Sequence, residues 1–205
     1  MEYEGLTADD LANVHALNGA WLRLQQAHAK ELPRLSNNQL RRLASAPFLL
    51  FSFREHDDCR WKSLLDGGPQ NDLLEEQATS GSDLLGLQTA GLAFLWGLAR
   101  RNGYVARLVS GAPLHWCELI ASATLVQILD SASRGLIIEP RLELASDSHK
   151  RLWLRGGSAV QNLRVYAQIS ALQAMLTSRE LVPFRRMPAA ACRMPQPAQQ
   201  VTNEV

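Results

Sequence analysis

Apolar residues recur every three or four positions over much of the chain, which is the pattern of amphipathic helices. Between Thr7 and Pro33 this spacing predicts one long helix, with the hydroxyl of Thr7 as its cap. Ser36 and Gln39 have the spacing of a capping box. They predict a second helix that ends before Pro47, because proline lacks the amide that would continue it.

Two short apolar runs depart from helical spacing and predict extended segments. Residues 48–53 are apolar at five of six positions and are too few for a helix, so we expect a buried extended segment. Residues 136–144 predict a second extended stretch, broken by Pro140. After each run we expect a polar stretch and then a short helix with one tryptophan, Trp61 or Trp153, ended by a pair of glycines.

The remaining apolar patterns predict four more helices. Residues 83–101 are apolar nearly all round, which is typical of a helix at the centre of a core. A short helix over 104–109 follows, and a helical pattern then runs from Pro113 to Gly135. Ser158 can cap a last long helix that extends past Leu176.

The order of these elements occurs twice. Residues 43, 45, 46, 50 and 51 align with similar residues at a constant offset of 86. We therefore expect a mainly α fold of two similar helical units related by a pseudo-twofold axis, each with a short extended segment. The extended segments would either pair antiparallel or lie in separate halves. The predicted boundaries are 1–68 for the first unit, 69–82 for an acidic, polar linker, 83–182 for the second unit with the C-terminal helix, and 183–205 for a disordered tail.

Composition supports the helical prediction. Leu occurs 35 times and Ala 26 times, while Val and Ile together occur 14 times. Leu and Ala lose little side-chain entropy in a helix, whereas β-branched residues lose more. The formal net charge of +1 excludes a polybasic binder on bulk charge alone. No apolar run is long enough to span a membrane, and the acidic N-terminus does not resemble a signal peptide, so we expect a cytoplasmic protein.

Residues that could carry chemistry are sparse. Cys59, Cys117 and Cys192 lack C-x-x-C spacing, so neither a structural zinc site nor a disulfide framework is expected. No phosphate-binding loop, dinucleotide fingerprint or nucleophile elbow is present in the sequence, and no small-molecule substrate is evident. We therefore expect no enzyme, no metal and no cofactor. A cleft that joined His115, Cys117 and an acid would reopen the enzyme hypothesis.

Arginine supplies the candidate contacts to DNA. The chain has 18 arginines, and an arginine side chain presents a planar fork of donors that suits phosphates. Five of them cluster near predicted helix ends, and these are Arg41, Arg42, Arg100, Arg101 and Arg107. An alternative for Arg100 and Arg101 is that they only favour the negative end of their helix dipole.

Several segments of the second half resemble flagellar master regulators of the FlhD/FlhC type. The resemblance rests on residues 91–100 (GLAFLWGLAR), 106–111 (ARLVSG), 119–132 and 136–141 (LIIEPR), and more weakly on residues 35–53. It implies a non-enzymatic bacterial-type transcriptional regulator that acts through protein partners or self-association, with DNA binding as an open alternative. A protein-interaction adaptor or chaperone-like module without DNA binding is the other hypothesis. Unlike FlhD, this chain would hold two copies in one polypeptide.

Overall fold

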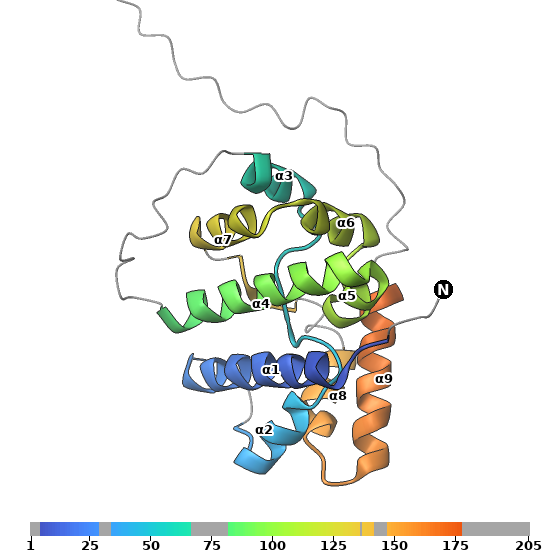
Figure 1. Cartoon of the computed structure of the whole chain (residues 1–205). Coiled ribbons are helices and arrows are strands. Elements are labelled where there is room, and N and C mark those ends of the chain that lie inside the picture. Colours follow the sequence, from blue (N-terminus) through green and yellow to red (C-terminus); the bar gives the residue numbers. More distant parts are fainter. Residues whose placement is uncertain (1–4, 29–33, 67–81, 136, 142–146, 178–205) are drawn as a thin grey trace, which may run out of the picture.

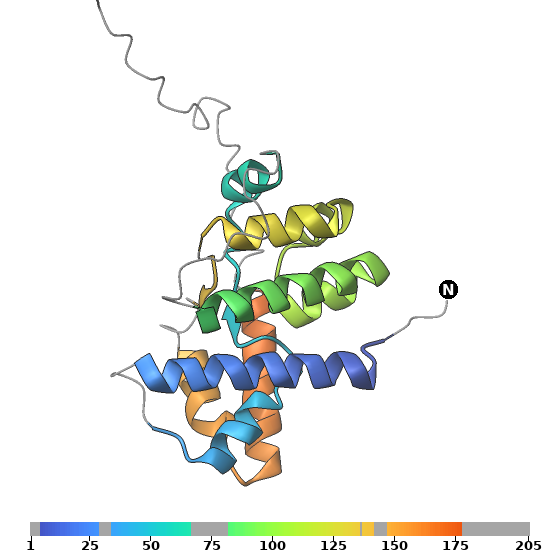
Figure 2. The same cartoon turned by 60° about the vertical axis from the view of Figure 1, so that its left-hand side comes forward.

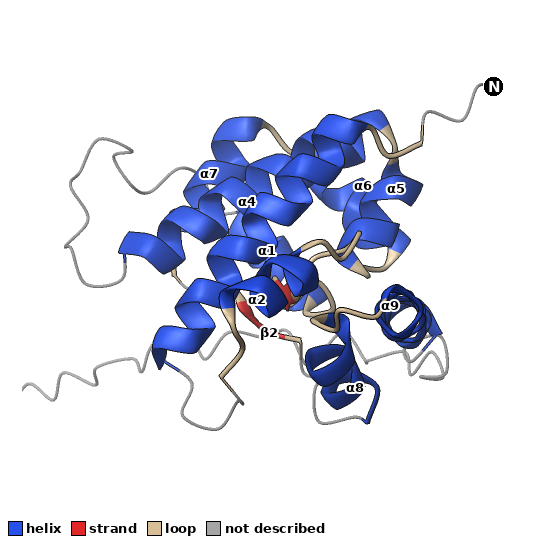
Figure 3. Cartoon of the chain, turned by 90° about the horizontal axis from the view of Figure 1, so that it is seen from below, coloured by secondary structure: helices blue, strands red, loops and turns tan. Residues whose placement is uncertain are grey.

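The structure is a computed structural model that describes residues 5–28, 34–66, 82–135, 137–141 and 147–177. This part of the chain holds nine helices and one two-stranded sheet, so the predicted mainly α class is confirmed. Figure 3 shows the two strands in red among the helices. None of the described helices has the length and apolar character needed to cross a membrane.

The first half has the predicted elements: α1 (Ala8–His28), α2 (Asn37–Ala44), β1 (Phe51–Ser52) and α3 (Asp58–Asp66). The hydroxyl of Thr7 accepts a hydrogen bond from the amide of Asp10 at 3.1 Å and so caps α1. Ser36 and Gln39 form the predicted capping box at the start of α2. Residues 48–53 are all buried, as expected for a segment that crosses the core.

The described part of the second half contains seven elements. They are α4 (Ser82–Arg101), α5 (Gly103–Ser110), α6 (Leu114–Ser122), α7 (Leu125–Ser133), β2 (Glu139–Pro140), α8 (Asp147–Gly156) and α9 (Gln161–Thr177). The predicted central helix is α4. The predicted linker 69–82 lies outside the described residues except for Ser82, which begins α4, and the predicted tail lies wholly outside them.

The prediction of an unbroken helical pattern from Pro113 to Gly135 is wrong. The chain is extended at Ala123 and Thr124, which separate α6 from α7. Thr124 forms a capping box with Gln127, and the indole of Trp96 donates to the carbonyl of Ala123 at 2.9 Å. These polar contacts satisfy the backbone at the break, so two short helices can replace one long helix.

Six of the helices form a stack in which α1 and α4 are the middle pair (Figures 1 and 2). On one side of this pair α7 packs on α4, and α3 packs on α7. On the other side α2 packs on α1, and α8 packs on α2. In Figure 1, α9 runs along the direction of this stack, across the axes of α1 and α4, and it packs on α8. One continuous apolar core extends through both halves of the chain.

The two strands pair antiparallel at the centre, which resolves the alternative that the sequence left open. Phe51 lies opposite Pro140, and Ser52 lies opposite Glu139. Pro140 is therefore part of the second strand and does not break it. A proline is tolerated there because a two-stranded sheet has only edge strands. An ion pair between Arg54 and Glu139, 2.8 Å apart, joins the ends of the strands.

Two buried side-chain amides anchor the segments that lead into the strands. Asn18 of α1 donates to the carbonyls of Ala44, Ala46 and Phe48 and accepts from the amide of Leu50 at 2.9 Å. Because buried backbone groups need partners, these bonds hold the turn after α2 against α1.

In the second half, Gln88 of α4 anchors the segment that leads from α7 into β2. It donates to the carbonyls of Ala132 and Gly135 at 2.7 and 2.9 Å. Its oxygen accepts from the amides of Ile137 and Ile138 at 2.7 and 3.0 Å. On each long central helix, a single buried side-chain amide thus holds the segment that follows a short helix, α2 or α7.

The tryptophan helices pack against the opposite half of the chain. The last turn of α3 meets α7, where the hydroxyl of Ser131 donates to the carbonyl of Leu64 at 3.4 Å. The last turn of α8 meets α2, where a Cβ added to Gly157 would stand 3.0 Å from the Cβ of Gln39. The glycine therefore permits the close approach of α8 to α2.

Candidate functional site

The five predicted DNA contacts lie in three separate places. Arg41 and Arg42 lie in the last turn of α2, Arg100 and Arg101 in the last turn of α4, and Arg107 in α5. The fold does not gather them into one surface. Arg41 lines a groove together with Arg23 and His15, and that groove is the strongest candidate site in the described part of the chain.

Arg100 and Arg101 have structural partners. Arg101 donates a hydrogen bond to the buried carboxylate of Asp10, which joins the end of α4 to the start of α1. The guanidinium of Arg100 lies 5.0 Å from the ring centroid of Trp96, in cation–π geometry. These contacts give both arginines a role in packing.

The environment of Asp10 favours its ionised form. Burial by itself raises the pKa of this carboxyl group, but hydrogen bonds from the side chain of Thr7, from Arg101 and from the Thr7 amide act in the opposite direction. Together with the charge of Arg101 they hold the pKa of Asp10 below its usual value. Asp10 is therefore a charged anchor for Arg101.

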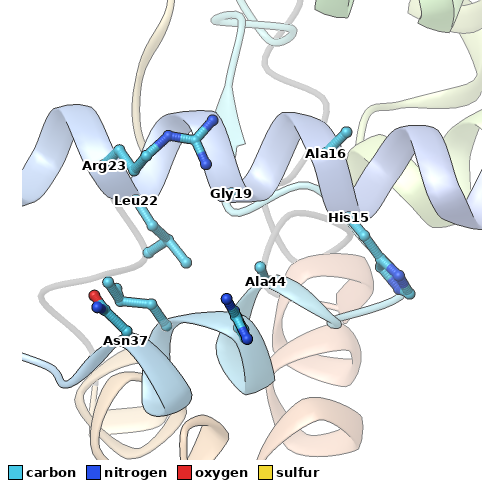
Figure 4. A pocket seen from close by; sticks show the side chains of 9 residues that line it. His15, Ala16, Gly19, Leu22, Arg23, Asn37 and Ala44 are labelled. Atoms are coloured by element: carbon cyan, nitrogen blue, oxygen red, sulfur yellow. The ribbon is translucent and has the colours of Figure 1, made fainter.

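The groove lies between α1 and α2 and has a volume of about 610 Å³ (Figure 4). Its floor is apolar and its rim carries basic and amide side chains. The lining residues are His15, Ala16, Gly19, Leu22, Arg23, Asn37, Leu40, Arg41 and Ala44. In Figure 4 the side chain of Arg23 extends along α1 towards Gly19. A Cβ added to Gly19 would stand 3.6 Å from Nη1 of Arg23, so the glycine leaves room for the guanidinium.

The described residues around the groove carry charge of one sign. Over residues 11–50, the part that the structure describes contains Arg23, Arg34, Arg41 and Arg42 and no Asp or Glu. None of the ion pairs between described residues involves Arg23, Arg41 or Arg42. Arginines of this kind offer their donors to an incoming anion, and the guanidinium fork fits phosphate oxygens.

The groove is held in shape by its own polar contacts. The amide of Asn18 fixes the end of α2 against α1. At the other end of the groove, Gln26 donates to the carbonyl of Leu35 at 3.0 Å, and the Ser36 capping box begins α2. A site with fixed walls loses little conformational entropy when a ligand binds.

Sequence reasoning missed three of the groove residues, His15, Arg23 and Asn37, as site residues. The pattern that could have identified His15 and Arg23 is the run of residues without an acid between Asp10 and Glu31. Asn37 lies beyond Glu31, and this pattern does not include it. Helical spacing also places His15 and Arg23 eight residues apart, on the same side of α1. Arg41 joins His15 and Arg23 at the groove only because α2 packs against α1, which the sequence pattern does not show.

The cleft that would reopen the enzyme hypothesis is not formed by His115 and Cys117. His115 is exposed and bonds to the carboxylate of Asp58 at 2.9 Å, while Cys117 is fully buried on α6. Burial raises the pKa of Cys117 to about 12, so its thiol stays protonated at neutral pH. No group of three or more metal-ligating side chains occurs within the described ranges.

Comparison of the chain with family models, curated proteins and solved structures finds no match.

Proposed function

We propose that this protein is a helical regulator that binds DNA through the basic face of α1 and α2. The observation that carries the proposal is that the described residues of 11–50 include no acid, while Arg23 and Arg41 come together at the groove from two helices. Arg42 follows Arg41 on α2, half-buried, and extends the same basic surface. Contacts from arginines to phosphates supply most of the affinity in sequence-independent DNA binding.

The resemblance to regulators of the FlhD/FlhC type supports the same class of function. It rests on the order of a long apolar helix, a short helix that ends at a glycine, a capped helix and an extended segment. The corresponding elements of this chain are α4, α5, α7 together with the end of α6, and β2, since the similar residues 119–132 begin within α6. In this order, α5 ends at Gly111 in the left-handed conformation and α7 begins with the Thr124 cap.

We also propose that the chain is an internal duplication, a single-chain equivalent of a twofold dimer. The capping box of Thr124 lies 88 residues after that of Ser36. Ala132 and Ile138, which bond to Gln88, lie 88 residues after Ala44 and Leu50, which bond to Asn18. This spacing replaces the offset of 86 suggested by the sequence.

The strand register supports the duplication independently. Phe51 pairs with Pro140 and Ser52 with Glu139. With an offset of 88, Glu139 is the counterpart of Phe51, and Pro140 is the counterpart of Ser52. Each residue therefore pairs with the counterpart of its neighbour, as in a contact between two copies related by a twofold axis. The packing of α3 on α7 and of α8 on α2 follows the same symmetry, because each of these short helices packs on the other half.

The two proposed units have different surfaces, which bears on how DNA would be contacted. With the offset of 88, the counterparts of Arg41 and Arg42 are the half-buried Leu129 and the buried Asp130 of α7. Among the described residues, the two arginines of α2 thus have no basic counterparts in α7. We therefore propose that one chain contacts one stretch of DNA backbone, and that palindromic recognition would require a second molecule.

The proposal is tested by fluorescence anisotropy with the full chain and a labelled mixed-sequence duplex of about 20 base pairs. The double variant Arg41→Gln/Arg42→Gln should bind at least about tenfold more weakly than the unaltered protein at low salt. The matched control is Arg151→Gln/Arg155→Gln, which removes two exposed charges from α8. An equal loss in both variants, or no binding by the unaltered protein, would overturn the proposal.

A second candidate function, a protein-interaction adaptor, is favoured by the outer face of α9. Leu163, Tyr166 and Ile169 are exposed at 45%, 63% and 59%, and their spacing places them on one side of the helix. An exposed apolar stripe of this kind is typical of docking surfaces. Purification from the native host distinguishes the two functions, because a stable protein partner without nucleic acid would favour the adaptor.

A further inference from the structure

An exposed apolar surface surrounds the first half of α9. In the described part of the chain ten large apolar side chains are exposed, and six of them lie between residues 154 and 169. Figure 3 shows α9 end-on at the edge of the molecule. Such a concentration of exposed apolar side chains marks an interaction surface.

The same helix lacks the charged outer face that surface helices usually carry. Its inner side consists of small and apolar residues that are buried against the fold. From Gln161 to Thr177 the only charged residue is Arg164, which is half-buried and donates to the carbonyl of Ser158 at 3.0 Å. The outer face of α9 is therefore uncharged, and depletion of charge is typical of the core of a protein–protein interface.

The order of side chains along this outer face is symmetric. Asn162, Tyr166, Ile169 and Gln173 are all exposed, and they follow one another at steps of four, three and four residues. These steps place them in one row on the helix, as in the seam between two helices of a coiled coil. The row has an amide at each end and two apolar side chains between them, so its character is the same when read in either direction.

We propose that a second copy of this chain covers the row, with the two α9 helices antiparallel across a twofold axis. Tyr166 of one copy then lies opposite Ile169 of the other, and Asn162 lies opposite Gln173. Apolar side chains meet apolar side chains, amides that both donate and accept meet amides, and no like charges face each other. The row thus complements its own copy. The inference does not rest on DNA binding, although the dimer would supply the second molecule that palindromic recognition requires.

Sedimentation equilibrium of the full chain without DNA tests the proposal, at protein concentrations up to about 100 μM. The expected particle is a dimer of about 45 kDa, twice the 22.7 kDa of one chain. Tyr166→Glu/Ile169→Glu places acids opposite one another and should raise the dissociation constant of the dimer at least about tenfold. The control Leu125→Glu/Val126→Glu changes two exposed apolar residues of α7 and should leave the dimer unchanged. Circular dichroism checks that each variant folds.

Engineered cysteines test the antiparallel order. In a Cys59→Ser/Cys192→Ser background, Asn162→Cys/Gln173→Cys should form a covalent dimer on mild oxidation, because the two positions face each other across the contact. Asn162→Cys alone should not, since its two copies lie at opposite ends of the contact. A monomeric unaltered chain would overturn the proposal and leave this face to a different protein. A dimer that the α9 variant does not weaken, or a covalent dimer from Asn162→Cys alone, would also overturn it.

Discussion

Asn18 and Gln88 hold equivalent positions in the two halves of the molecule, although they lie on different helices and differ in length. Each is fully buried in a long central helix, and each bonds to the carbonyl that ends a short helix and to an amide that leads into a strand. The bonds to Asn18 also set the position of α2, and therefore the width of the basic groove.

Replacing either amide by an apolar residue of similar size should destabilise the protein strongly. Asn18→Leu and Gln88→Met each leave several buried backbone groups without partners, at about 1–3 kcal/mol for a buried unsatisfied group. We expect a loss of about 3 kcal/mol in the free energy of unfolding, measured by urea denaturation of the full chain. Asn13→Leu, an exposed position on α1, should change it by less than about 0.5 kcal/mol. A loss below about 1 kcal/mol in both buried variants would contradict this role.

Two glycines of α4 should respond to alanine in opposite directions. A Cβ on Gly91 would stand 2.7 Å from Cζ of Phe53, whereas a Cβ on Gly97 meets nothing within 4 Å. Gly91→Ala should lower the free energy of unfolding by about 1–3 kcal/mol through overpacking of the core. Gly97→Ala should raise it by up to about 1 kcal/mol, because alanine favours the helix. Thermal unfolding of both variants measures these changes, and a stabilising Gly91→Ala would contradict the close contact between Gly91 and Phe53.

The ion pair of Asp10 should make stability depend on pH in the acid range. Because the pKa of Asp10 is lowered on folding, its contribution is present above the unfolded pKa of about 3.9 and is lost as pH falls through the folded value. Asp10→Asn should therefore reduce the free energy of unfolding by roughly 1 kcal/mol or more at neutral pH. The difference from the unaltered protein should shrink below about pH 4. A difference that is constant from pH 7 to pH 3 would rule out the charged contact.

Cys117 should be inert towards thiol reagents in the folded protein. Burial raises its pKa to about 12, and its side chain is fully enclosed. In a Cys59→Ser/Cys192→Ser variant, a disulfide reagent should label the remaining thiol only as fast as the protein unfolds, and rapidly in urea. Stoichiometric labelling within seconds under native conditions would restore Cys117 as a reactive group.

The local elements of the fold could be predicted because their determinants lie close together in the sequence. The Thr7 cap, the Ser36–Gln39 box and the helical spacing of α4 each depend on residues within a few turns. Apolar spacing alone does not indicate the break at Ala123. The Thr124–Gln127 capping box is a local signal of a helix start there, whereas the bond from Trp96 comes from another helix.

The candidate site required tertiary information. Arg41 and Arg42 stood out as an adjacent pair, but their relation to Arg23 depends on how α1 packs against α2. Equally, nothing local indicated that Arg101 would bond to Asp10, because 91 residues separate them. Charge patterns in a sequence identify residues able to bind anions, whereas the fold decides which of them are already engaged.

The salt dependence of DNA affinity tests the central claim most directly. Each phosphate contact adds about 0.9 to the slope of log K against log salt. Over roughly 50–200 mM salt the unaltered protein should show a steep negative slope, and Arg41→Gln/Arg42→Gln should reduce its magnitude by about 2. The control Arg151→Gln/Arg155→Gln should keep the original slope. Binding that is insensitive to salt, or equal slopes for the groove variant and the unaltered protein, would contradict the assignment of the α1–α2 face to DNA.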